Sequence, residues 1–388
     1  MSKLKVIVLG CGNIGSIIAQ DLAENLNGAE ITVSLRDKER AKAAASRIEG
    51  ANWTTINAKD YSKLVEVVGE FDLIIGALPS EYGYQSMRAA ADAGVNMVDI
   101  STPSEDPLQL DNMAKEAGIT IIPDCGVAPG LTNMLVGYSA SRLDVMRKAH
   151  IMTGSIPEHP LPPMGWELST FWERWVSTAE AVIEFYLMDV SIVEGGRIVH
   201  VPTLSGLEEL DFPGVGKLEA FYTGGLRTMI GSYPGVSSMW EKTLRYPGNV
   251  EGIKLLRELG FFDEKTVMVG DVQVSPRTVS ARILEKSLKK PIVEDILAMR
   301  VEVIGEKGGR EVRMSYHLLD HFDRVKGVSA MARMTGYPAA VTARKLAQGE
   351  IKEKGVVPPE RIGEKETLFK SLLSDLRRKG VKVEETYQ

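Results

Sequence analysis

Three glycines near the start of the chain have the spacing of a phosphate-binding turn. Gly10, Gly12 and Gly15 form a G-x-G-x-x-G pattern, directly after an apolar run and before an amphipathic stretch. Gly10 would permit the tight bend, Gly12 would let the backbone approach a pyrophosphate, and Gly15 would allow close helix–strand packing. Asn13 and Ile14 would open the helix, whose N-terminus offers free N–H groups to phosphates. The pattern predicts a dinucleotide site; a glycine turn without function is the alternative.

The choice of dinucleotide depends on residues about twenty positions further on, where the chain reads Ser34-Leu35-Arg36-Asp37. An acidic residue at the end of the second strand binds the ribose 2′-hydroxyl of NAD, whereas an arginine accommodates the 2′-phosphate of NADP. If Leu35 takes the place of the acid, Ser34 and Arg36 favour NADP. If Asp37 takes it, NAD is allowed, and Arg36 is a solvated surface residue. We expect NADP, with NAD as the alternative.

Two aspartates follow apolar runs and could act on a substrate. Ligands of a doubly wound sheet lie outside the carboxyl ends of its strands, where Asp99 and Asp124 are expected together with Ala77, Leu78 and Pro79. A carboxylate at this edge can accept a proton from an amine and offset the positive charge of an iminium. We therefore interpret both aspartates as candidate catalytic residues. Helix-capping or turn aspartates are the alternative.

Basic residues further along could anchor the carboxylate of an amino-acid substrate. Arginine suits this role because its guanidinium forms two parallel hydrogen bonds to a carboxylate. Arg227 and Arg245 are our candidates, followed by Lys242, and surface ion pairs are the alternative for each. His317 and His321 stand four residues apart, but their segment alternates like a strand and no third ligand is evident, so no metal site is expected.

The elements that must position these residues are clearest in the first 130 residues. Short apolar runs alternate there with amphipathic stretches, which predicts a parallel sheet with helices on both faces. Runs without polar alternation fit strands that are buried on both sides. We expect a Rossmann-type, doubly wound α/β domain, with strands at 5–9, 31–35, 51–56, 73–77, 96–100 and 120–122 and helices at 13–26, 38–48, 62–68, 84–93 and 108–117.

From about residue 131 the pattern changes to strand-like segments separated by glycine turns. This predicts a second, α+β domain with a mostly antiparallel sheet. Residues 153–165 carry four prolines and are expected to form a loop. We divide the chain into a dinucleotide-binding domain (1–130), a substrate and dimerisation domain (131–335) and C-terminal helices (336–388). Expected strands cover 198–201, 218–222, 266–274, 299–304 and 312–318, and expected helices cover 339–346 and 366–379.

Composition limits the classes of partner and compartment. The 388 residues include 46 Lys+Arg and 52 Asp+Glu, a formal net charge of −6, which argues against nucleic acid as a partner. No apolar run approaches the roughly 18 residues that a membrane span needs. Two cysteines, Cys11 and Cys125, form no disulfide framework. The first apolar run is too short for a signal peptide, so we expect a cytoplasmic protein.

Several longer segments carry a family resemblance. They read VLGCGNIG at 8–15, LIIGALPSEYGYQSMRAAADAGVNMVDIS at 73–101, IIPDCGVAPGLTNML at 121–135, LEAFYTGGLRTM at 218–229, TLRYPG at 243–248 and AMARMTGYPAA at 330–340. Together they resemble the saccharopine dehydrogenase-like family over most of the chain, and within it most closely the lysine 6-dehydrogenases. The segments at 121–135 and 243–248 are distinctive, because a generic nucleotide-binding domain lacks them.

The resemblance implies a two-domain enzyme that oxidises a carbon–nitrogen bond of a lysine-derived amino acid with NAD(P). In a lysine 6-dehydrogenase the side-chain amine becomes an imine and then a semialdehyde, and the C-terminal helices pack back on the nucleotide domain. The alternatives are a reductive condensation that forms saccharopine or carboxynorspermidine, and a non-catalytic dinucleotide-binding protein. We expect a homodimer, since strand-rich substrate domains often self-associate.

Two departures from the family pattern concern the substrate. The family has a W-S-P-R stretch that supplies an arginine, whereas residues 175–178 read WVST, with no arginine after Ser177. The tryptophan-rich stretch at 166–175 is also longer than the family pattern.

Overall fold

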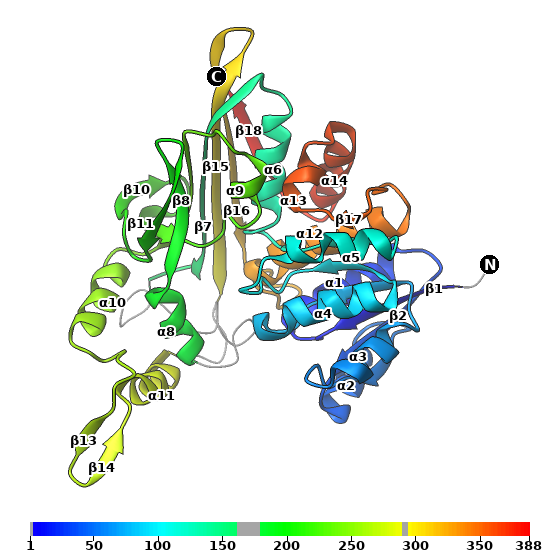
Figure 1. Ribbon diagram of the computed structural model, residues 1–388, viewed down its shortest axis with the longest axis horizontal. Coiled ribbons are helices and arrows are strands. Elements are labelled where there is room, and N and C mark those ends of the chain that lie inside the picture. The colour runs from blue at the N-terminus through cyan, green and yellow to red at the C-terminus, as the bar shows by residue number, and fades with distance from the viewer. Residues whose placement is uncertain (1–2, 161–178, 289–293) are drawn as a thin grey trace.

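The computed structural model describes residues 3–160, 179–288 and 294–388. Two large sheets organise the chain: a parallel sheet flanked by helices, at the right of Figure 1, and a taller mixed sheet beside it. Among the described residues, no helix is long and apolar enough to cross a membrane.

The first sheet has seven strands in the order β17-β6-β5-β4-β1-β2-β3, and every pairing in it is parallel. This confirms the Rossmann-type, doubly wound fold expected from the alternating pattern. Each strand after the first is reached through a helix, so the carboxyl ends of all the strands share one edge. Its strands are β1 (Leu4–Leu9), β2 (Ala29–Leu35), β3 (Asn52–Thr55), β4 (Leu73–Gly76), β5 (Asn96–Asp99), β6 (Thr120–Ile122) and β17 (Gly355–Val356).

Both faces of this sheet are buried along its central strands, whereas the edge strand β3 is mostly exposed. Val6 and Val8 of β1 pack into one apolar core, and Ile7 and Leu9 pack into another on the opposite face, as the alternation of side chains along a strand requires. This explains why the strands read as unbroken apolar runs. The helices here are α1 (Asn13–Asn25), α2 (Lys38–Ala45), α3 (Tyr61–Val68), α4 (Ser80–Ala93), the 3₁₀ turn η1 (Pro107–Leu110), α5 (Asp111–Glu116) and α6 (Leu131–Ala140).

The second sheet has nine strands and is mostly antiparallel, as expected, although β12 and β7 pair in parallel at its centre. Its main path runs β10-β11-β12-β7-β15-β16-β18, and β8 and β9 join at β12. The strands are β7 (Val145–Pro157), β8 (Asp189–Glu194), β9 (Arg197–Pro202), β10 (Glu208–Phe212), β11 (Gly216–Thr223), β12 (Ser238–Arg245), β15 (Asp295–Lys307), β16 (Arg310–His321) and β18 (Glu384–Tyr387).

Three local predictions for this region were wrong. Residues 153–157, expected in a loop, end the long strand β7, because they pair with β15 along their whole length. Residues 266–274, expected as one strand, form the hairpin of β13 (Val267–Val269) and β14 (Val272–Val274), which turns at Gly270 with φ +61°. The helix expected at 339–346 begins nine residues earlier, as α12 (Ala330–Ala347).

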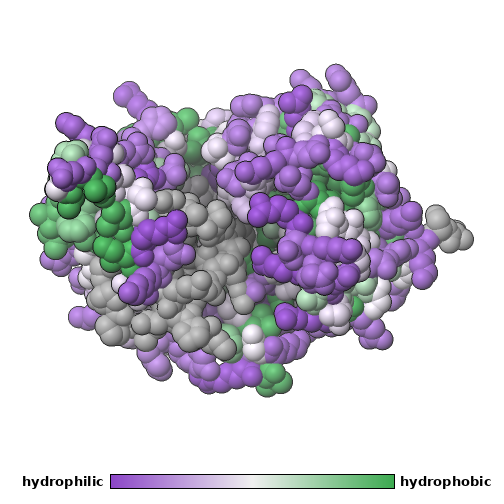
Figure 2. Space-filling model, turned by 90° about the horizontal axis from the view of Figure 1, so that it is seen from below, coloured by the Kyte–Doolittle hydropathy of each residue, from purple (hydrophilic) through white to green (hydrophobic). Residues whose placement is uncertain are grey.

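The hairpin extends away from both sheets and carries exposed apolar side chains, including Val267, Met268 and Val272. Figure 2 shows hydrophobic residues gathered at the left edge of the molecule, the side on which the hairpin lies in Figure 1. The helices beside these strands are α8 (Ala179–Leu187), α9 (Met229–Ser232), α10 (Asn249–Glu258) and α11 (Pro276–Leu288).

The last part of the chain returns to the first sheet. Helix α12 lies against α1 so closely that a Cβ atom at Gly336 would sit 2.9 Å from the Ile17 side chain. Strand β17 then pairs with β6 at the edge of the parallel sheet. Helices α13 (Pro359–Gly363) and α14 (Glu366–Arg378) follow. This is the arrangement that the family resemblance implied, while the limits of the three domains stay a prediction.

Candidate active site

The glycine turn has the geometry that its sequence pattern predicts. Gly10 has φ +87°, and a Cβ atom there would lie 2.4 Å from the carbonyl oxygen of Ala77. At Gly15 a Cβ atom would lie 2.0 Å from the carbonyl oxygen of Gly10, whereas at Gly12 it would meet nothing within 4 Å. Helix α1 begins at Asn13, next to Ile14, and no side chain caps its N-terminus. The turn therefore leaves open backbone where a pyrophosphate would bind.

The residues at the end of β2 and directly after it have three different roles. The Ser34 hydroxyl is buried and donates to the carbonyl oxygen of Val8 at 3.1 Å, so it faces the sheet and not the ligand edge. Asp37 caps α2 by accepting from the backbone N–H of Arg40 at 2.8 Å. Arg36 is exposed directly beyond the strand and makes no ion pair within the described ranges. Arg36 is thus the residue here whose side chain can reach a 2′-phosphate.

The loop after β4 lies beside the glycine turn. Ala77 donates its backbone N–H to the carbonyl oxygen of Leu9 at 2.8 Å, and its own carbonyl oxygen faces Gly10. Leu78 is half-buried, and Pro79 is exposed at the position that precedes α4. The structure therefore brings all three loop residues to the carboxyl edge, as expected.

Asp99 is completely buried at the end of β5. Its Oδ1 accepts from the backbone N–H of Ser101 at 2.7 Å and from the Ser101 hydroxyl at 2.5 Å. Its Oδ2 has no hydrogen-bond partner among the described residues. A Cβ atom at Gly76 would lie only 1.9 Å from this oxygen, so a side chain at that position would collide with it. Burial raises the pKa of Asp99 to about 7, and the charge of Asp124 acts in the same direction.

Asp124 and Arg227 form an ion pair that joins the two sheets. The Arg227 Nε donates to Asp124 Oδ2 at 3.0 Å, and the Asp124 side chain is fully buried. Burial raises the pKa of Asp124, and Arg227 opposes that shift. Asp124 Oδ1 and Arg227 Nη2 are buried without a hydrogen-bond partner in the part of the chain that the structure describes.

The backbone of this pair is strained. Asp124 has φ +53° and Arg227 has φ +50°, and nearby Thr102 has φ +46°. Residues with a Cβ atom rarely adopt this left-handed region, which costs of order 1–3 kcal/mol each and occurs preferentially at active sites. Of the four such residues in the described chain, two form this ion pair and a third, Thr102, follows Asp99 by three positions.

The basic candidates on β12 do not come together. Arg245 is buried on the sheet face that carries Glu241, where it interacts with the Tyr186 hydroxyl. Lys242 points to the opposite face, where its Nζ donates to Glu208 Oε1 at 2.7 Å. The aromatic rings of Tyr222 and Trp240 cover it there, with centroids 4.8 and 4.7 Å from Nζ. Lys242 and Arg245 therefore do not share a face of β12, because residues three apart on a strand lie on opposite faces.

The sequence interpretation missed Glu360, a completely buried glutamate on α13. Its Oε1 accepts from the Ser232 hydroxyl at 2.7 Å, burial raises its pKa, and the charge of Asp124 adds to that shift. Nothing in the local sequence PPERIG marks it, because an acidic residue in the first turn of a helix ordinarily faces solvent. Its burial follows from the close contact of α13 with α6, where Gly137 and Gly363 leave no room for side chains.

Together these residues make a cluster with more acids than bases. The charge of Asp124 acts on both Asp99 and Glu360, and Asp124 itself pairs with the guanidinium of Arg227. Such a cluster favours bound protons and positive charge. It lies beyond the carboxyl ends of β5 and β6, which is where ligands of doubly wound sheets bind.

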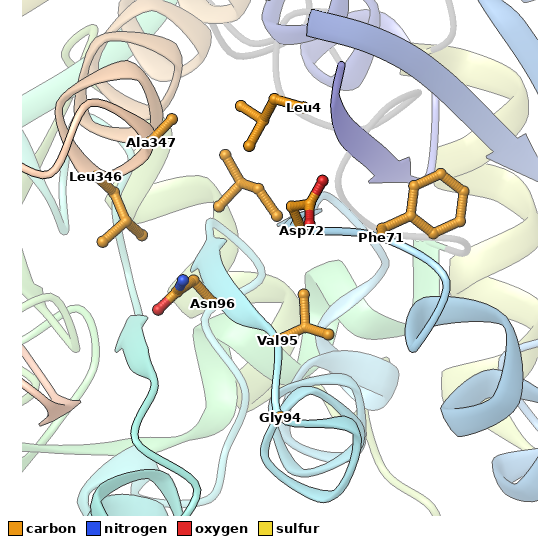
Figure 3. A pocket seen from close by; sticks show the side chains of 9 residues that line it. Leu4, Phe71, Asp72, Gly94, Val95, Asn96, Leu346 and Ala347 are labelled. Atoms are coloured by element: carbon orange, nitrogen blue, oxygen red, sulfur yellow. The ribbon is translucent and has the colours of Figure 1, made fainter. Parts of the chain in front are cut away.

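Other features of the described residues do not belong to this site. A cavity of about 340 Å³, lined by Leu4, Asp72 and Asn96 among others, lies at the amino ends of the parallel strands, the opposite edge of the sheet (Figure 3). His317 and His321 both lie on β16, and the described ranges contain no group of three or more potential metal ligands. The stretch at 166–175 and the missing arginine after Ser177 lie outside the described residues.

Two protein families match the chain. Residues 6–122 match the saccharopine dehydrogenase NADP binding domain, and residues 126–381 match the saccharopine dehydrogenase C-terminal domain. The first match confirms NADP as the expected cofactor, and the exposed Arg36 and the open backbone at Gly12 fit it. The family also confirms the expected type of enzyme, an amino-acid oxidoreductase.

Curated relatives also match most of this chain. The saccharopine dehydrogenase [NADP(+), L-glutamate-forming] of Pyricularia oryzae is 22% identical, and the match covers 96% of this chain and 97% of that protein. The carboxynorspermidine synthase of Vibrio cholerae is also 22% identical, with 92% of each chain covered. The mitochondrial alpha-aminoadipic semialdehyde synthase of Rattus norvegicus is 24% identical over 92% of this chain, which spans 45% of that longer protein.

A solved structure has the same fold. The apo saccharopine dehydrogenase (L-Glu forming) of Saccharomyces cerevisiae superposes with a TM-score of 0.81, covering 99% of this chain and 100% of that one at 18% identity. With both domains matched and the fold shared, the chain belongs to the saccharopine dehydrogenase family of NADP-dependent oxidoreductases.

Proposed function

We propose that this protein oxidises the side-chain carbon–nitrogen bond of a lysine-derived amino acid with NADP⁺, in the manner of a lysine 6-dehydrogenase. The observation that carries the proposal is the acid-rich cluster around Arg227, next to the glycine turn. A substrate amine is positively charged before and after this reaction, as an ammonium and then as an iminium. Buried carboxylates in excess over cations suit both charges.

The cofactor would be held by the residues at the carboxyl edge. The open backbone at Gly12 and the N-terminus of α1 would bind the pyrophosphate, and Arg36 would pair with the 2′-phosphate. Bound NADP⁺ supplies the hydride acceptor. The loop at 77–79, which lies against the glycine turn, would cover the nicotinamide half.

The carboxylates would handle the proton and the charge. Asp99, with a pKa of about 7, can accept a proton from the substrate ammonium, because its Oδ2 is not engaged by any described residue. The neutral amine can then release a hydride from its carbon and become an iminium. Asp124, held by Arg227, would offset that positive charge. Hydrolysis of the iminium by water would yield the semialdehyde and an ammonium ion.

The substrate carboxylate needs a cation. The Arg227 Nη2, which has no described hydrogen-bond partner, can donate to the substrate carboxylate. Arg245 would act from the face of β12 that carries Glu241. A guanidinium that already pairs with Asp124 is oriented before the substrate arrives, which reduces the entropy lost on binding. We therefore assign Arg227 the principal anchoring role and Arg245 the secondary one.

The reductive direction is the second candidate. The relatives named for saccharopine and carboxynorspermidine chemistry favour it. The same cluster would protonate and stabilise an imine formed between an aldehyde and an amine, and NADPH would be oxidised in place of NADP⁺ being reduced.

Absorbance of the nicotinamide at steady state separates the two candidates. Purified protein with L-lysine and NADP⁺ should produce NADPH if the oxidative proposal holds. NADPH consumption that requires both an aldehyde and an amine, with no reaction of L-lysine, would support the condensation instead. The absence of turnover in both assays would reject both functions.

Cofactor preference tests the assignment of Arg36. We expect Arg36→Ala to weaken NADP⁺ binding roughly tenfold to a hundredfold while NAD⁺ binding stays unchanged, because a charge-assisted phosphate contact is lost. Arg40→Ala is the matched control, since Arg40 is equally exposed four residues further on. Equal losses for both cofactors in Arg36→Ala would contradict the assignment. Fluorescence titration with NADPH and NADH measures both affinities.

We also propose that the protein is a cytoplasmic homodimer with domain limits near residues 130 and 335. Sedimentation equilibrium measures the mass in solution, and a monomer at micromolar concentration would contradict the dimer.

A further inference from the structure

Arg227 lies in the middle of a segment that buried glutamates hold on both sides. The segment comprises residues 223–233, between β11 and β12, and we call it the Arg227 segment. On its upstream side, Glu241 Oε2 accepts from the Thr223 hydroxyl at 2.8 Å and from the backbone N–H of Gly225 at 2.7 Å. A Cβ atom at Gly225 would lie 2.5 Å from the Glu241 carboxylate, so there is no room for a side chain between them.

The downstream side is held from the C-terminal part of the chain. Glu360 Oε1 accepts from the Ser232 hydroxyl at 2.7 Å, and the Tyr233 hydroxyl donates to Glu364 at 3.0 Å. Both glutamates belong to α13 or follow it directly. The segment therefore contacts three separate parts of the fold: β12 through Glu241, α13 through Glu360, and the loop after β6 through Asp124.

We propose that Glu241 and Glu360 are positioning residues that hold Arg227 against Asp124 in its left-handed backbone conformation. Both glutamates accept hydrogen bonds from the Arg227 segment itself, Glu241 from Thr223 and Gly225 and Glu360 from Ser232. The proposal deepens the function proposed above and rests on it for the role of Arg227 toward the substrate.

The physical reason is that a strained conformation persists only where the surrounding structure fixes it. An arginine with φ +50° would relax if its neighbours were free, and its side chain would then leave Asp124. Buried hydrogen bonds to carboxylates are strong and costly to leave unmade, so they fix the segment at Gly225 and at Ser232. Between these points only Leu226 to Gly231 remain, with Leu226 buried in the apolar core.

Hydrogen exchange tests the positioning without any reliance on catalysis. In Glu241→Ala and in Glu360→Ala, the amides of residues 223–233 should exchange at least roughly tenfold faster than in the native protein, because local opening becomes easier. Asp295→Ala is the matched control. Asp295 is also a fully buried acid, and it accepts from the backbone N–H groups of Ala330 and Met331 at 2.7 and 2.9 Å. Its loss should speed exchange at the start of α12 and leave residues 223–233 unchanged.

Kinetics then tests the consequence for the substrate. Glu241→Ala and Glu360→Ala should raise the KM for the amino acid roughly tenfold to a hundredfold, since displacement of an anchor by about 1 Å has effects of this size. The KM for NADP⁺ should not change. Glu241→Gln and Glu360→Gln keep an acceptor oxygen and should restore most of the affinity. Asp295→Ala should leave both KM values unchanged.

The outcomes are distinguishable. Faster exchange at 223–233 with a selective rise in the amino-acid KM, rescued by glutamine, supports the proposal. Unchanged exchange at 223–233 in both alanine variants overturns it, as does an equal rise in both KM values. If native protein fails to oxidise any lysine-related amine, the proposed function fails, and the exchange result still decides whether the glutamates position Arg227.

Discussion

Two buried ionic clusters in this molecule differ in their balance of charge. One, which we call the Asp21 network, ties α1 to α12 and α14. Asp21 pairs with Arg344 at 3.6 Å and accepts from Lys379, while Asp375 lies 3.9 Å from Arg344 and 3.3 Å from Lys345. Each aspartate thus has at least two cationic partners. The network joins the first helix to the last ones.

The cluster around Arg227 has the opposite balance. Three buried acids lie here with one ion pair, between Asp124 and Arg227, and within the described ranges neither Asp99 nor Glu360 forms an ion pair. Its ion pair also joins two residues with left-handed backbone, whereas Asp21 lies within a regular helix. A cluster that stabilises the fold compensates its charges, and one that binds a cationic substrate leaves negative charge in excess.

The largest effect should come from removing the charge of Asp124. Asparagine tolerates left-handed backbone, so Asp124→Asn keeps the turn while leaving Arg227 without its counterion. We expect turnover to fall about a thousandfold, within the range for loss of a charged catalytic group. Affinity for NADPH should be unchanged, because Arg36 and the glycine turn are intact. Steady-state kinetics and fluorescence titration measure the two. Turnover at the native rate would mean that Asp124 has a structural role and not a catalytic one.

The next effect concerns the pH dependence of Asp99. Its folded-state pKa is about 7 against 3.8 in the unfolded chain, so the native state binds this proton more tightly. The resulting stability is fully present below about pH 4 and is lost as the pH rises through about 7. Over the same interval Asp99 becomes an effective proton acceptor, and kcat/KM for amine oxidation should rise through about pH 7.

Asp99→Asn should remove both dependences. Turnover at pH 8 should fall about a hundredfold and lose its inflection near pH 7, while unfolding free energy at pH 8 should not decrease, because an unpaired buried charge is gone. Asp320→Asn is the control, since burial raises the pKa of Asp320 to about 6 on β16, where it pairs with Arg333. If Asp320→Asn abolishes the activity inflection and Asp99→Asn retains it, Asp99 is not the acceptor. Kinetics and chemical denaturation across pH 5–9 provide the data.

A substitution in the Asp21 network should lower the stability of the protein and leave its activity unchanged. Asp21→Ala leaves Arg344 and Lys379 without their shared partner, both largely buried. We expect the free energy of unfolding to fall by about 3 kcal/mol, the size found when one member of a buried pair is removed. Both kcat and KM should be unchanged below the melting temperature. A selective loss of kcat with unchanged stability would mean that the charge-balance criterion fails to separate the two clusters.

The sequence predicts the central strands of the parallel sheet well because they are apolar runs between amphipathic helices, whereas the two-residue edge strand β17 was not predicted. β6, at residues 120–122, begins and ends where it was expected, and Asp99 lies at the end of its strand as predicted. The second sheet was predicted less completely. Strand β7 carries polar residues and ends at Pro157, and its strand conformation depends on its pairing with β12 and β15, which no local pattern reveals.

The site could be predicted only in part, for two physical reasons. Contacts between distant segments, such as Ser232 with Glu360, depend on how α13 packs, and the sequence around Glu360 is that of an ordinary exposed helix. The direction of a side chain on a strand depends on the register. Lys242 and Arg245 were grouped as anchors, but their separation of three places them on opposite faces of β12 once its strand conformation is known.

That alternation supports the smallest prediction. Lys242→Met keeps the packing of the aliphatic stem between Tyr222 and Trp240 and removes the pairing with Glu208, whose side chain is 43% exposed. The KM for the amino acid should stay unchanged, and stability should fall by about 1 kcal/mol or less, since a half-exposed partner remains solvated. Arg245→Met, on the face of β12 that carries Glu241, should raise the KM for the amino acid instead. A tenfold rise in Lys242→Met alone would mean that the outer face of the sheet, and not the cluster around Arg227, receives the substrate.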